Sequence, residues 1–228
     1  MKSQSPEKSA PNALTAVLVN RSPLSETAFE IELTRPPSFE FTAGQSIRFI
    51  HKAMERDYSL ISAPGDPTLA LCVRNVERGR FSSILTSAGV GAQFYFTGPH
   101  GYFTFRLSLR PAVFVATGTG IAPFVSMCRS GATGFTLLHG VRLPSDLYYQ
   151  PLFRVAAQLY MPCLSGAPIE SPKLAHTFRG TVTEYLERLL PSGLYDFYLC
   201  GRREMIQDVT LLVDERFPGS FVYTEVFY

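Results

Sequence analysis

Tryptophan is absent from this 228-residue chain and cysteine is scarce, with four residues and no C-x-x-C pair among them. Zinc and iron–sulfur sites in proteins are built from closely spaced thiolates. The wide spacing of Cys72, Cys128, Cys163 and Cys200 therefore predicts no metal site in this chain. Any metal chemistry in which the protein takes part would belong to a partner.

Long apolar runs and an excess of one charge are also missing. No segment approaches the roughly 18 uninterrupted apolar residues of a membrane span. The start, MKSQSPEKSAPNA, is polar and has no apolar core of the kind a signal peptide needs. The formal net charge is +2 and no basic stripe is visible, which argues against a nucleic-acid partner. We therefore expect a soluble cytoplasmic protein, monomeric by default, that binds neither membrane nor nucleic acid.

The first half of the chain consists of short segments in which apolar and polar residues alternate. Period two with Pro, Gly and Ser clusters between the segments is typical of an antiparallel barrel or sandwich. The predicted strands are TAVLV (15–19), AFEIEL (28–33), SIRFI (46–50), LALCVRNV (69–76) and AQFYFTG (92–98).

From about Pro111 the pattern changes to continuous apolar runs followed by helical stretches. Strands buried on both faces belong to a parallel sheet, so the second half predicts a doubly wound α/β domain. The predicted strands are 112–116, 135–139, 159–164, 195–200 and 221–227, and the predicted helices are 121–129, 146–157, 181–190 and 203–216. We expect a disordered tail over 1–12, an all-β domain over 13–108 and an α/β domain over 109–228, with a ligand site in a cleft between the domains.

The segment VATGTGIAPF (115–124) joins a predicted strand to a predicted helix through Gly118 and Gly120. Glycine allows a sharp turn and a close approach of the backbone, and the free amides of a helix start attract phosphate. A plain tight turn without a ligand explains the loop equally well. The acidic residue that usually holds the adenine ribose is missing, and the next strand ends in His139-Gly140-Val141-Arg142, where Arg142 could meet a phosphate.

Two segments of the first half suit a large flat cofactor. Arg56-Asp57-Tyr58-Ser59 offers a forked cationic donor, a flat aromatic face and a small hydroxyl. Some twenty residues later, a glycine-led turn begins a short helix, with Gly79, Phe81 and Ser82 in sequence, again suited to a phosphate.

These motifs together resemble the ferredoxin–NAD(P)H reductase family. The resemblance rests on Arg56-x-Tyr58-Ser59, Gly79-x-x-Ser82, Gly118-Thr119-Gly120-Ile121-Ala122-Pro123 and Cys200-Gly201-x-x-x-Met205, and it covers the chain from about residue 13. It implies an N-terminal antiparallel β-barrel that binds FAD and a C-terminal α/β parallel-sheet domain that binds NADH or NADPH.

The resemblance also implies roles for individual residues. Arg56 is expected at the FAD pyrophosphate, Tyr58 against the isoalloxazine and Ser59 near flavin N5. The FAD-binding set is completed by Cys72, Val73 and Arg74, mainly through their backbone, and by Gly79, Phe81 and Ser82. The nicotinamide-dinucleotide set is Thr117, Gly118, Thr119, Gly120, Pro123, Arg142, Gly201 and Met205. Members that resemble the plant enzymes end in a glutamate followed two residues later by an aromatic that covers the flavin; Glu225 and Phe227 stand in that register, and Tyr228 offers a second ring.

The reaction implied is hydride transfer from nicotinamide to flavin N5, with Ser59, Cys200, Glu225 and Phe227 around its path. Electrons would then pass to a ferredoxin-like iron–sulfur protein. Direct reduction of free flavin, ferric chelates or quinones is one alternative, and a non-catalytic electron-relay or regulatory subunit is another. Relatives that prefer NADPH often carry a Ser–Arg pair where this chain has Ser165-Gly166, so we favour NADH, although Arg142, Lys173 and Arg179 could replace the missing arginine.

Overall fold

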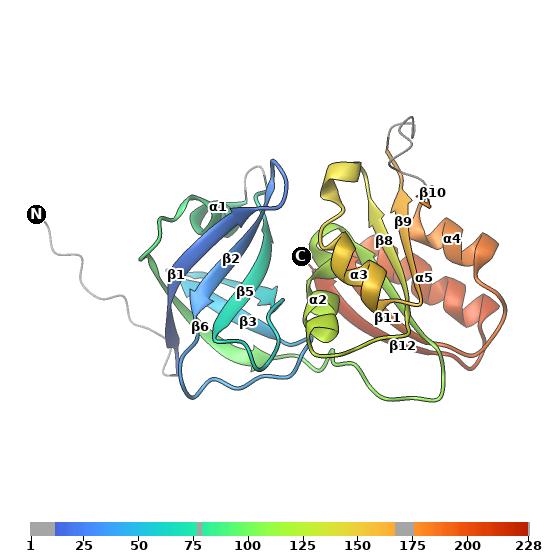
Figure 1. Cartoon of the computed structure of the whole chain (residues 1–228), viewed down its shortest axis with the longest axis horizontal. Coiled ribbons are helices and arrows are strands. Elements are labelled where there is room, and N and C mark those ends of the chain that lie inside the picture. Colours follow the sequence, from blue (N-terminus) through green and yellow to red (C-terminus); the bar gives the residue numbers. More distant parts are fainter. Residues whose placement is uncertain (1–11, 77–78, 167–175, 228) are drawn as a thin grey trace, which may run out of the picture. The chain divides into compact units, whose positions relative to one another are not determined.

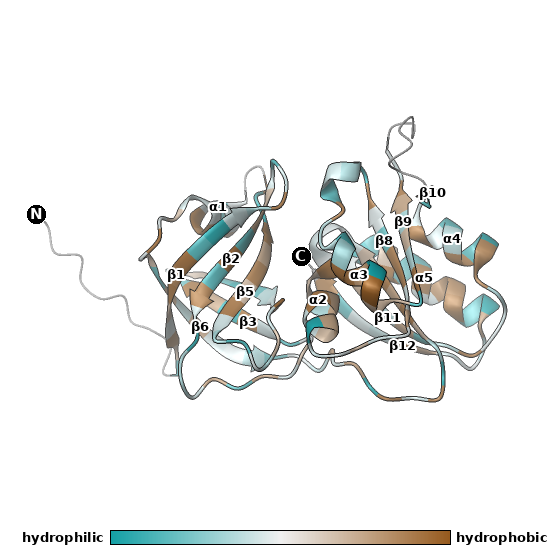
Figure 2. Ribbon diagram, in the orientation of Figure 1, coloured by the Kyte–Doolittle hydropathy of each residue, from teal (hydrophilic) through white to brown (hydrophobic). Residues whose placement is uncertain are grey.

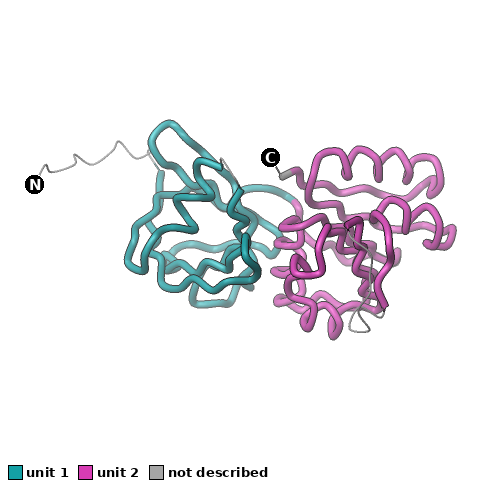
Figure 3. The backbone as a smooth tube through the Cα atoms, turned by 90° about the horizontal axis from the view of Figure 1, so that it is seen from above, with its two compact units in different colours: residues 1–102 teal, residues 103–228 magenta. Residues whose placement is uncertain are grey.

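The computed structural model describes residues 12–76, 79–166 and 176–227. The chain divides into two compact units, Met1–Tyr102 and Phe103–Tyr228, which Figures 1 and 3 show. Within the described ranges, no helix has both the length and the apolar character needed to cross a membrane.

The first unit is a six-stranded sheet in which every neighbouring pair is antiparallel. The strand order is β4-β3-β6-β1-β2-β5. The two edge strands meet at an isolated bridge between Leu60 and Leu71, where the N–H of Ile61 donates to the carbonyl of Ala70 (2.8 Å). The sheet therefore closes on itself, which confirms the expected antiparallel barrel. The elements are β1 Leu14–Pro23, β2 Ala28–Thr34, β3 Ser46–His51, β4 Met54–Ser59, β5 Thr68–Arg74, α1 Arg80–Ser87 and β6 Gln93–His100.

Successive side chains of each barrel strand point in turn into a single hydrophobic core and outward. Ile31 and Leu33 of β2 are fully buried, whereas Glu30 and Glu32, which alternate with them, remain partly exposed. The core is rich in aromatic rings, with Phe49 at its centre. Period two was therefore the informative signal in this half of the sequence.

The second unit is a six-stranded sheet in which every pair is parallel. Its order is β10-β9-β8-β7-β11-β12, so the chain builds outward from β7 first on one side and then on the other. The elements are β7 Ala112–Thr117, α2 Ala122–Arg129, β8 Thr136–Val141, α3 Gln150–Ala156, β9 Leu159–Leu164, β10 Phe178–Arg179, α4 Val182–Leu189, β11 Asp196–Arg202, α5 Arg203–Arg216 and β12 Phe221–Phe227, with 3-10 helices at Gly118–Ile121 and Pro144–Asp146.

Helices cover both faces of this sheet. Val113 and Val115 of β7 face the layer that contains α4 and α5, whose apolar sides are visible in Figure 2. Phe114, between them, stacks on Phe124 of α2 from the opposite face, with ring centroids 4.7 Å apart. Both faces of each central strand are thus buried, which confirms the doubly wound α/β domain.

The segment 103–108, which we expected to complete the first domain, packs within the second unit. The ring of Phe103 contacts Phe124, and the ring of Phe105 contacts Phe114. The N–H of Arg106 donates to the hydroxyl of Tyr198 (3.2 Å).

Candidate nucleotide-binding sites

The glycine loop begins at the carboxyl end of β7, where the order of the sheet reverses. β7 lies between β8 and β11, and the 3-10 helix Gly118–Ile121 leads directly into α2. In open α/β sheets, ligands bind outside the carboxyl ends of the strands at this point. The loop thus lies at the position that a nucleotide would take.

Close packing between this loop and the end of β11 makes glycine necessary at two positions. A Cβ on Gly120 would collide with the carbonyl oxygen of Cys200 and lie 2.6 Å from the Cα of Gly201. A Cβ on Gly201 would collide with the hydroxyl of Thr117, and the φ of Gly201 is +141°. The N–H of Arg202 donates to that same hydroxyl (3.0 Å). The motifs at 117–123 and 200–205 therefore form one compact site.

The helical segment formed by the 3-10 helix Gly118–Ile121 and α2 has, among the described residues, no side-chain cap at its start. Pro123 lies in the first turn, and no described side chain caps this end of the helix. Gly118 adopts a φ of +54°, and the space where its Cβ would stand is open. The N–H of Ala122 donates to the carbonyl of Thr119, so an anion would meet the amides at the start of the 3-10 helix, where the positive end of the helical segment suits a phosphate group. The loop therefore fits the pyrophosphate of a dinucleotide.

Cys200 and Glu225 lie side by side on neighbouring strands, as their register shows. Cys200 is fully buried, and this burial, with a contribution from Glu225, raises the pKa of its thiol well above the ordinary value. The thiol is accordingly protonated at neutral pH. Met205 lies in the first turn of α5, where it packs into the core of the unit.

Arg142 follows β8 and is exposed at the same end of the sheet. The segment after β9 packs on it closely, because the N–H of Ser165 donates to the carbonyl of Val141 (3.1 Å). A Cβ on Gly166 would collide with the carbonyl oxygen of Arg142. Arg179 of β10 is also exposed, whereas Lys173 lies outside the described residues.

The residues expected to hold FAD come together in the first unit along the two edge strands. Beyond the Leu60–Leu71 bridge, the antiparallel direction carries Tyr58 and Ser59 of β4 towards Cys72 and Val73 of β5. Val73 is completely buried in the core and Cys72 nearly so. Contact between these two residues and a ligand would therefore run mainly through their backbone. Arg74, at the end of β5, is exposed.

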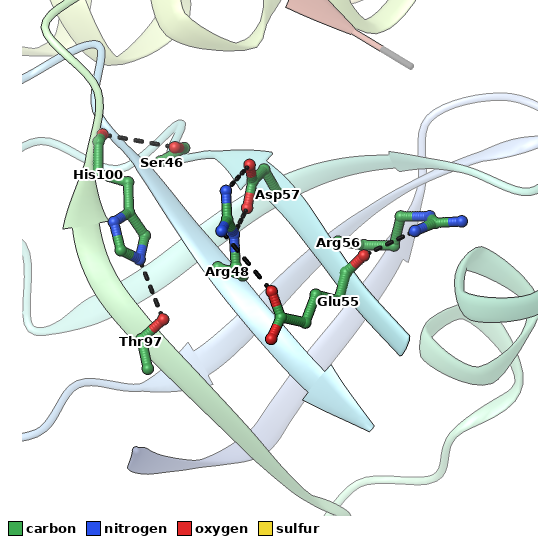
Figure 4. Close-up of polar contacts among 7 residues, drawn as sticks. All are labelled: Ser46, Arg48, Glu55, Arg56, Asp57, Thr97 and His100. Atoms are coloured by element: carbon green, nitrogen blue, oxygen red, sulfur yellow. Dashed lines mark hydrogen bonds and ion pairs between the residues drawn. The ribbon is translucent and has the colours of Figure 1, made fainter. Parts of the chain in front are cut away.

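Side chains of β4 alternate between two different surroundings. Arg48 of β3 forms a two-pronged ion pair with Asp57 (2.6 and 2.8 Å) and lies 3.6 Å from Glu55 (Figure 4). Arg56 extends away from these carboxylates and donates to the backbone carbonyl of Glu55 (2.7 Å). The carboxylates of Glu55 and Asp57 are therefore paired with Arg48 and do not neutralise the guanidinium of Arg56.

Tyr58 lies on the same face of β4 as Arg56 and packs against the barrel core. Its ring centroid is 5.8 Å from that of Phe49 and 6.1 Å from that of Phe81, at the start of α1. Burial raises the pKa of Tyr58 to about 12, against the opposing effect of Arg56. The exposed fraction of Phe81 is 3%, so its ring lies in the barrel core and supports Tyr58 from that side. Ser59 is buried on the other face of β4.

The turn before α1 presents a second uncapped helix start. Gly79 is the N-cap residue, and no side-chain cap hydrogen bond forms at this helix start in the described part of the chain. A Cβ on Gly79 would collide with the hydroxyl of Ser82 and lie 2.8 Å from the carbonyl oxygen of Val76. The Ser82 hydroxyl accepts from the N–H of Val76 (3.3 Å), which fixes the turn. This turn, Arg56 and the edges of β4 and β5 fit an extended dinucleotide such as FAD.

The C-terminal strand carries Glu225 next to Cys200, and the backbone of Phe227 pairs with Arg202. The side chain of Phe227 and the whole of Tyr228 lie outside the described residues. Their expected place over the flavin stays a prediction.

One residue near the glycine loop was not among the expected site residues. His139 is completely buried at the end of β8, with its Nε2 3.1 Å from the carbonyl oxygen of Gly118. A histidine in the otherwise apolar strand TLLHGV, next to a strand that ends in the glycine loop, was the available signal. The Arg48–Asp57 pair was also missed, although both residues lie in strands that proved to be neighbours.

Comparison with known proteins gives each half of the chain a matching domain family. Residues 16–105 match the oxidoreductase FAD-binding domain, and residues 114–210 match the oxidoreductase NAD-binding domain. The toluate 1,2-dioxygenase electron transfer component of Pseudomonas putida is 31% identical over 221 residues, which are 91% of this chain and 66% of that protein. The 2-halobenzoate 1,2-dioxygenase electron transfer component of Burkholderia cepacia is 30% identical over 90% of this chain and 64% of its own length.

This chain therefore spans slightly less than two thirds of the length of those two relatives. A solved structure, a ferredoxin NADP+ reductase from Neisseria gonorrhoeae with bound FAD and NADP, shares the fold with a TM-score of 0.80. It is 19% identical and is matched over 95% of this chain and 99% of its own. With one domain model matched in each structural unit and relatives over nine tenths of the sequence, the chain belongs to the ferredoxin–NAD(P)H reductase family of flavoproteins.

Proposed function

We propose that this protein is an FAD-dependent NAD(P)H oxidoreductase that passes electrons to a ferredoxin-like iron–sulfur protein. The observation that carries the proposal is the packing of Gly120 and Gly201 against the ends of β7 and β11. This packing leaves an uncapped helix start at the switch point of the sheet, where a dinucleotide pyrophosphate fits. When bound, FAD supplies the chemistry, because it accepts a hydride from nicotinamide and releases electrons singly.

The roles of the protein's own groups follow from their positions. Arg56 supplies positive charge for a pyrophosphate, and the amides at the start of α1 add donors to it. Tyr58 offers a flat ring that is supported by Phe49 and Phe81. We assign Ser59 to a hydrogen bond near flavin N5, and Cys200 and Glu225 to the surroundings of the nicotinamide. Phe227 is the ring that we expect to cover the flavin and to move aside for the nicotinamide.

Cys200 would act there as a neutral group. Its thiol is fully buried and its pKa is raised, so it can donate a weak hydrogen bond or fill space without placing a negative charge in the site. Cys200→Ser keeps the size and the donor, whereas Cys200→Ala removes the donor. If both variants reduced flavin as fast as the wild type, our assignment of Cys200 to the hydride path would fail.

NADH is the nicotinamide cofactor that we favour. The position where an arginine often meets the 2′-phosphate of NADPH is Gly166, and the carbonyl of Arg142 occupies the space where a side chain would begin. Of the cations near this edge, Arg142 and Arg179 are exposed. A comparison of kcat/KM for the two cofactors tests this choice, and a large preference for NADPH would overturn it.

The acceptor is proposed from the relatives. Both relatives named above are described as electron transfer components of dioxygenases. From this likeness we propose that an iron–sulfur protein of the ferredoxin type receives the electrons. We further propose that the protein acts in the cytoplasm and that it is a monomer. Size-exclusion chromatography with light scattering would test the oligomeric state.

The deciding experiment incubates the purified protein with FAD, removes the unbound flavin and titrates the protein anaerobically with NADH and with NADPH. Loss of the flavin absorbance bands supports the oxidoreductase proposal, whereas a protein that takes up no FAD would support a relay or regulatory subunit instead. Steady-state assays with a small acidic ferredoxin, free FMN, ferric citrate and a quinone then identify the acceptor class. Efficient turnover with free FMN and none with ferredoxin would favour the direct reductase.

A further inference from the structure

His139 of β8 lies beneath the glycine loop and joins it to the interior of the sheet. Its register partners are Ala116 of β7 and Pro162 of β9, and its side chain is completely buried. The Nε2 atom is 3.1 Å from the carbonyl oxygen of Gly118, and the Nδ1 atom is 3.5 Å from the hydroxyl of Tyr160. The imidazole therefore bridges β9 and the first residue of the loop.

The chemistry of the two partners determines which nitrogen carries the proton. A carbonyl oxygen only accepts hydrogen bonds, so Nε2 must carry the hydrogen that it donates to Gly118. Nδ1 is then the acceptor, and the hydroxyl of Tyr160 can donate to it. The ring of Tyr160 is held in turn by Phe153 of α3, with centroids 5.8 Å apart.

The imidazole is neutral under ordinary conditions. Burial lowers the pKa of His139 to about 4, against the opposing effects of the Gly118 carbonyl and of the carboxylate of Asp146. The other titratable group that faces it is Tyr160, which burial keeps protonated by raising its pKa. His139 thus acts on the loop as a fixed hydrogen-bond donor and adds no charge.

The hydrogen bond from His139 holds the carbonyl of Gly118, the residue at which the 3-10 helix of the loop begins. Gly118 has a φ of +54°, and glycine can also adopt many other conformations. In a trans peptide the carbonyl and the next N–H point in opposite directions. Because the Gly118 carbonyl points inward at His139, the N–H of Thr119 points outward, away from the buried imidazole. That direction suits an anion bound on the outer side of the loop.

We propose that His139 is a positioning residue that holds the Gly118 carbonyl inward, so that the loop amides stay directed at the pyrophosphate of the nicotinamide dinucleotide. The identity of the ligand rests on the proposed function, whereas the hydrogen bond between His139 and Gly118 does not depend on it. This hydrogen bond, called the anchor below, should affect the binding of the nicotinamide dinucleotide and not hydride transfer. The reason is that His139 contacts the buried side of the loop.

The test compares four variants of the FAD-loaded protein. His139→Leu removes the donor, His139→Gln places an amide nitrogen near the position of Nε2, and Tyr160→Phe removes only the supporting hydroxyl. Phe135→Leu is the matched control, since Phe135 is a buried ring just before the start of β8 and its loss leaves the donor in place. The measurements are the dissociation constant of NADH, or of NADPH if that cofactor binds better, the limiting rate of flavin reduction and the melting temperature.

We expect His139→Leu to raise the dissociation constant about tenfold, which corresponds to the loss of about 1.4 kcal/mol, with the limiting rate within about twofold of wild type. His139→Gln should recover most of the affinity, and Tyr160→Phe should lose about twofold. An unchanged dissociation constant in His139→Leu would overturn the proposal. So would an equal loss of affinity in Phe135→Leu, because affinity would then follow stability alone.

A second measurement separates this proposal from the proposed function. Nitrogen-15 NMR of the histidine rings should show one of the four histidines as a neutral Nε2–H tautomer from pH 8 to pH 5.5, and that signal should vanish in His139→Gln. The amide of Ala122, which donates to the carbonyl of Thr119, should exchange with solvent faster in His139→Leu. If the wild type bound no nicotinamide dinucleotide, the proposed function would fail and these two results would still decide the anchor. An Nδ1–H tautomer or a charged ring would overturn it.

Discussion

The hydroxyl of Thr117 accepts a hydrogen bond from the backbone N–H of Arg202 at 3.0 Å, and this bond joins the ends of β7 and β11. The glycine loop leaves from the first of these strands and the Cys200-Gly201 segment belongs to the second. This side-chain bond extends the backbone pairing of the two strands to the point where the two halves of the candidate nicotinamide site meet.

Replacing Thr117 with valine keeps the shape of the side chain and removes the acceptor. We expect a loss of about 1 kcal/mol in the free energy of unfolding and a weaker affinity for NADH. Urea unfolding and a binding titration measure the two effects. Thr224→Val on the neighbouring strand β12 is the control, because Thr224 is exposed and should change neither quantity noticeably. Equal effects of the two substitutions would mean that the Thr117 bond has no special role.

The two glycines of the loop should respond differently to alanine. A Cβ on Gly120 would collide with the carbonyl of Cys200, so Gly120→Ala must separate the loop from β11. We expect a loss of about 3 kcal/mol or more in stability, together with loss of nicotinamide binding. Gly118→Ala meets no atom and suffers only from its φ of +54°, which costs about 1 to 2 kcal/mol. Thermal melting of both variants checks the order, and a more harmful Gly118→Ala would contradict the close packing.

Tyr58 should contribute to FAD binding through its ring and not through its hydroxyl. Tyr58→Phe retains the contacts with Phe49 and Phe81, so the dissociation constant of FAD should stay within about twofold. Tyr58→Leu removes the flat face and should weaken FAD binding about tenfold or more, equivalent to about 1.4 kcal/mol. Flavin fluorescence during titration of the apoprotein measures both constants. Equal affinity in all three proteins would exclude stacking on Tyr58.

His139 should make the protein sensitive to acid. Its pKa is lowered from 6.5 in the unfolded chain to about 4 in the folded protein by burial. Between these values the unfolded state binds more protons, so the contribution of His139 is fully present above pH 6.5 and is lost as the pH falls towards 4.

In His139→Gln, the slope of the unfolding free energy against pH should fall in that range. The decrease should correspond to at most one bound proton. Urea unfolding at several pH values between 4 and 7 measures the slope. His176→Gln is the control, since it makes the same substitution at an exposed position. An unchanged slope in His139→Gln would show that His139 is not buried in its neutral form.

Local sequence patterns predicted most of the helices and strands. They failed where a single residue set the end of a helix or where a strand was very short. Helix α5 begins and ends where expected, because Met205, Ile206, Val209 and Val213 recur at helical spacing on its buried side. The helix expected over 146–157 is shorter, Gln150–Ala156, since Tyr149 adopts a φ of +58° and Pro151 cannot donate to a preceding turn. Strand β10 has two residues, too few to show any period.

The sequence by itself determined which residues face the cores, which segments turn, and that two glycine-led loops follow strands. Period two, continuous apolar runs and glycine positions are local properties, and they carry the family motifs. Only the tertiary structure decided which loops meet. The bonds from Arg202 to Thr117 and from His139 to Gly118 join residues 85 and 21 positions apart. Such pairs depend on the order of strands in the sheet, which is set by the packing of the whole unit and not by any local pattern.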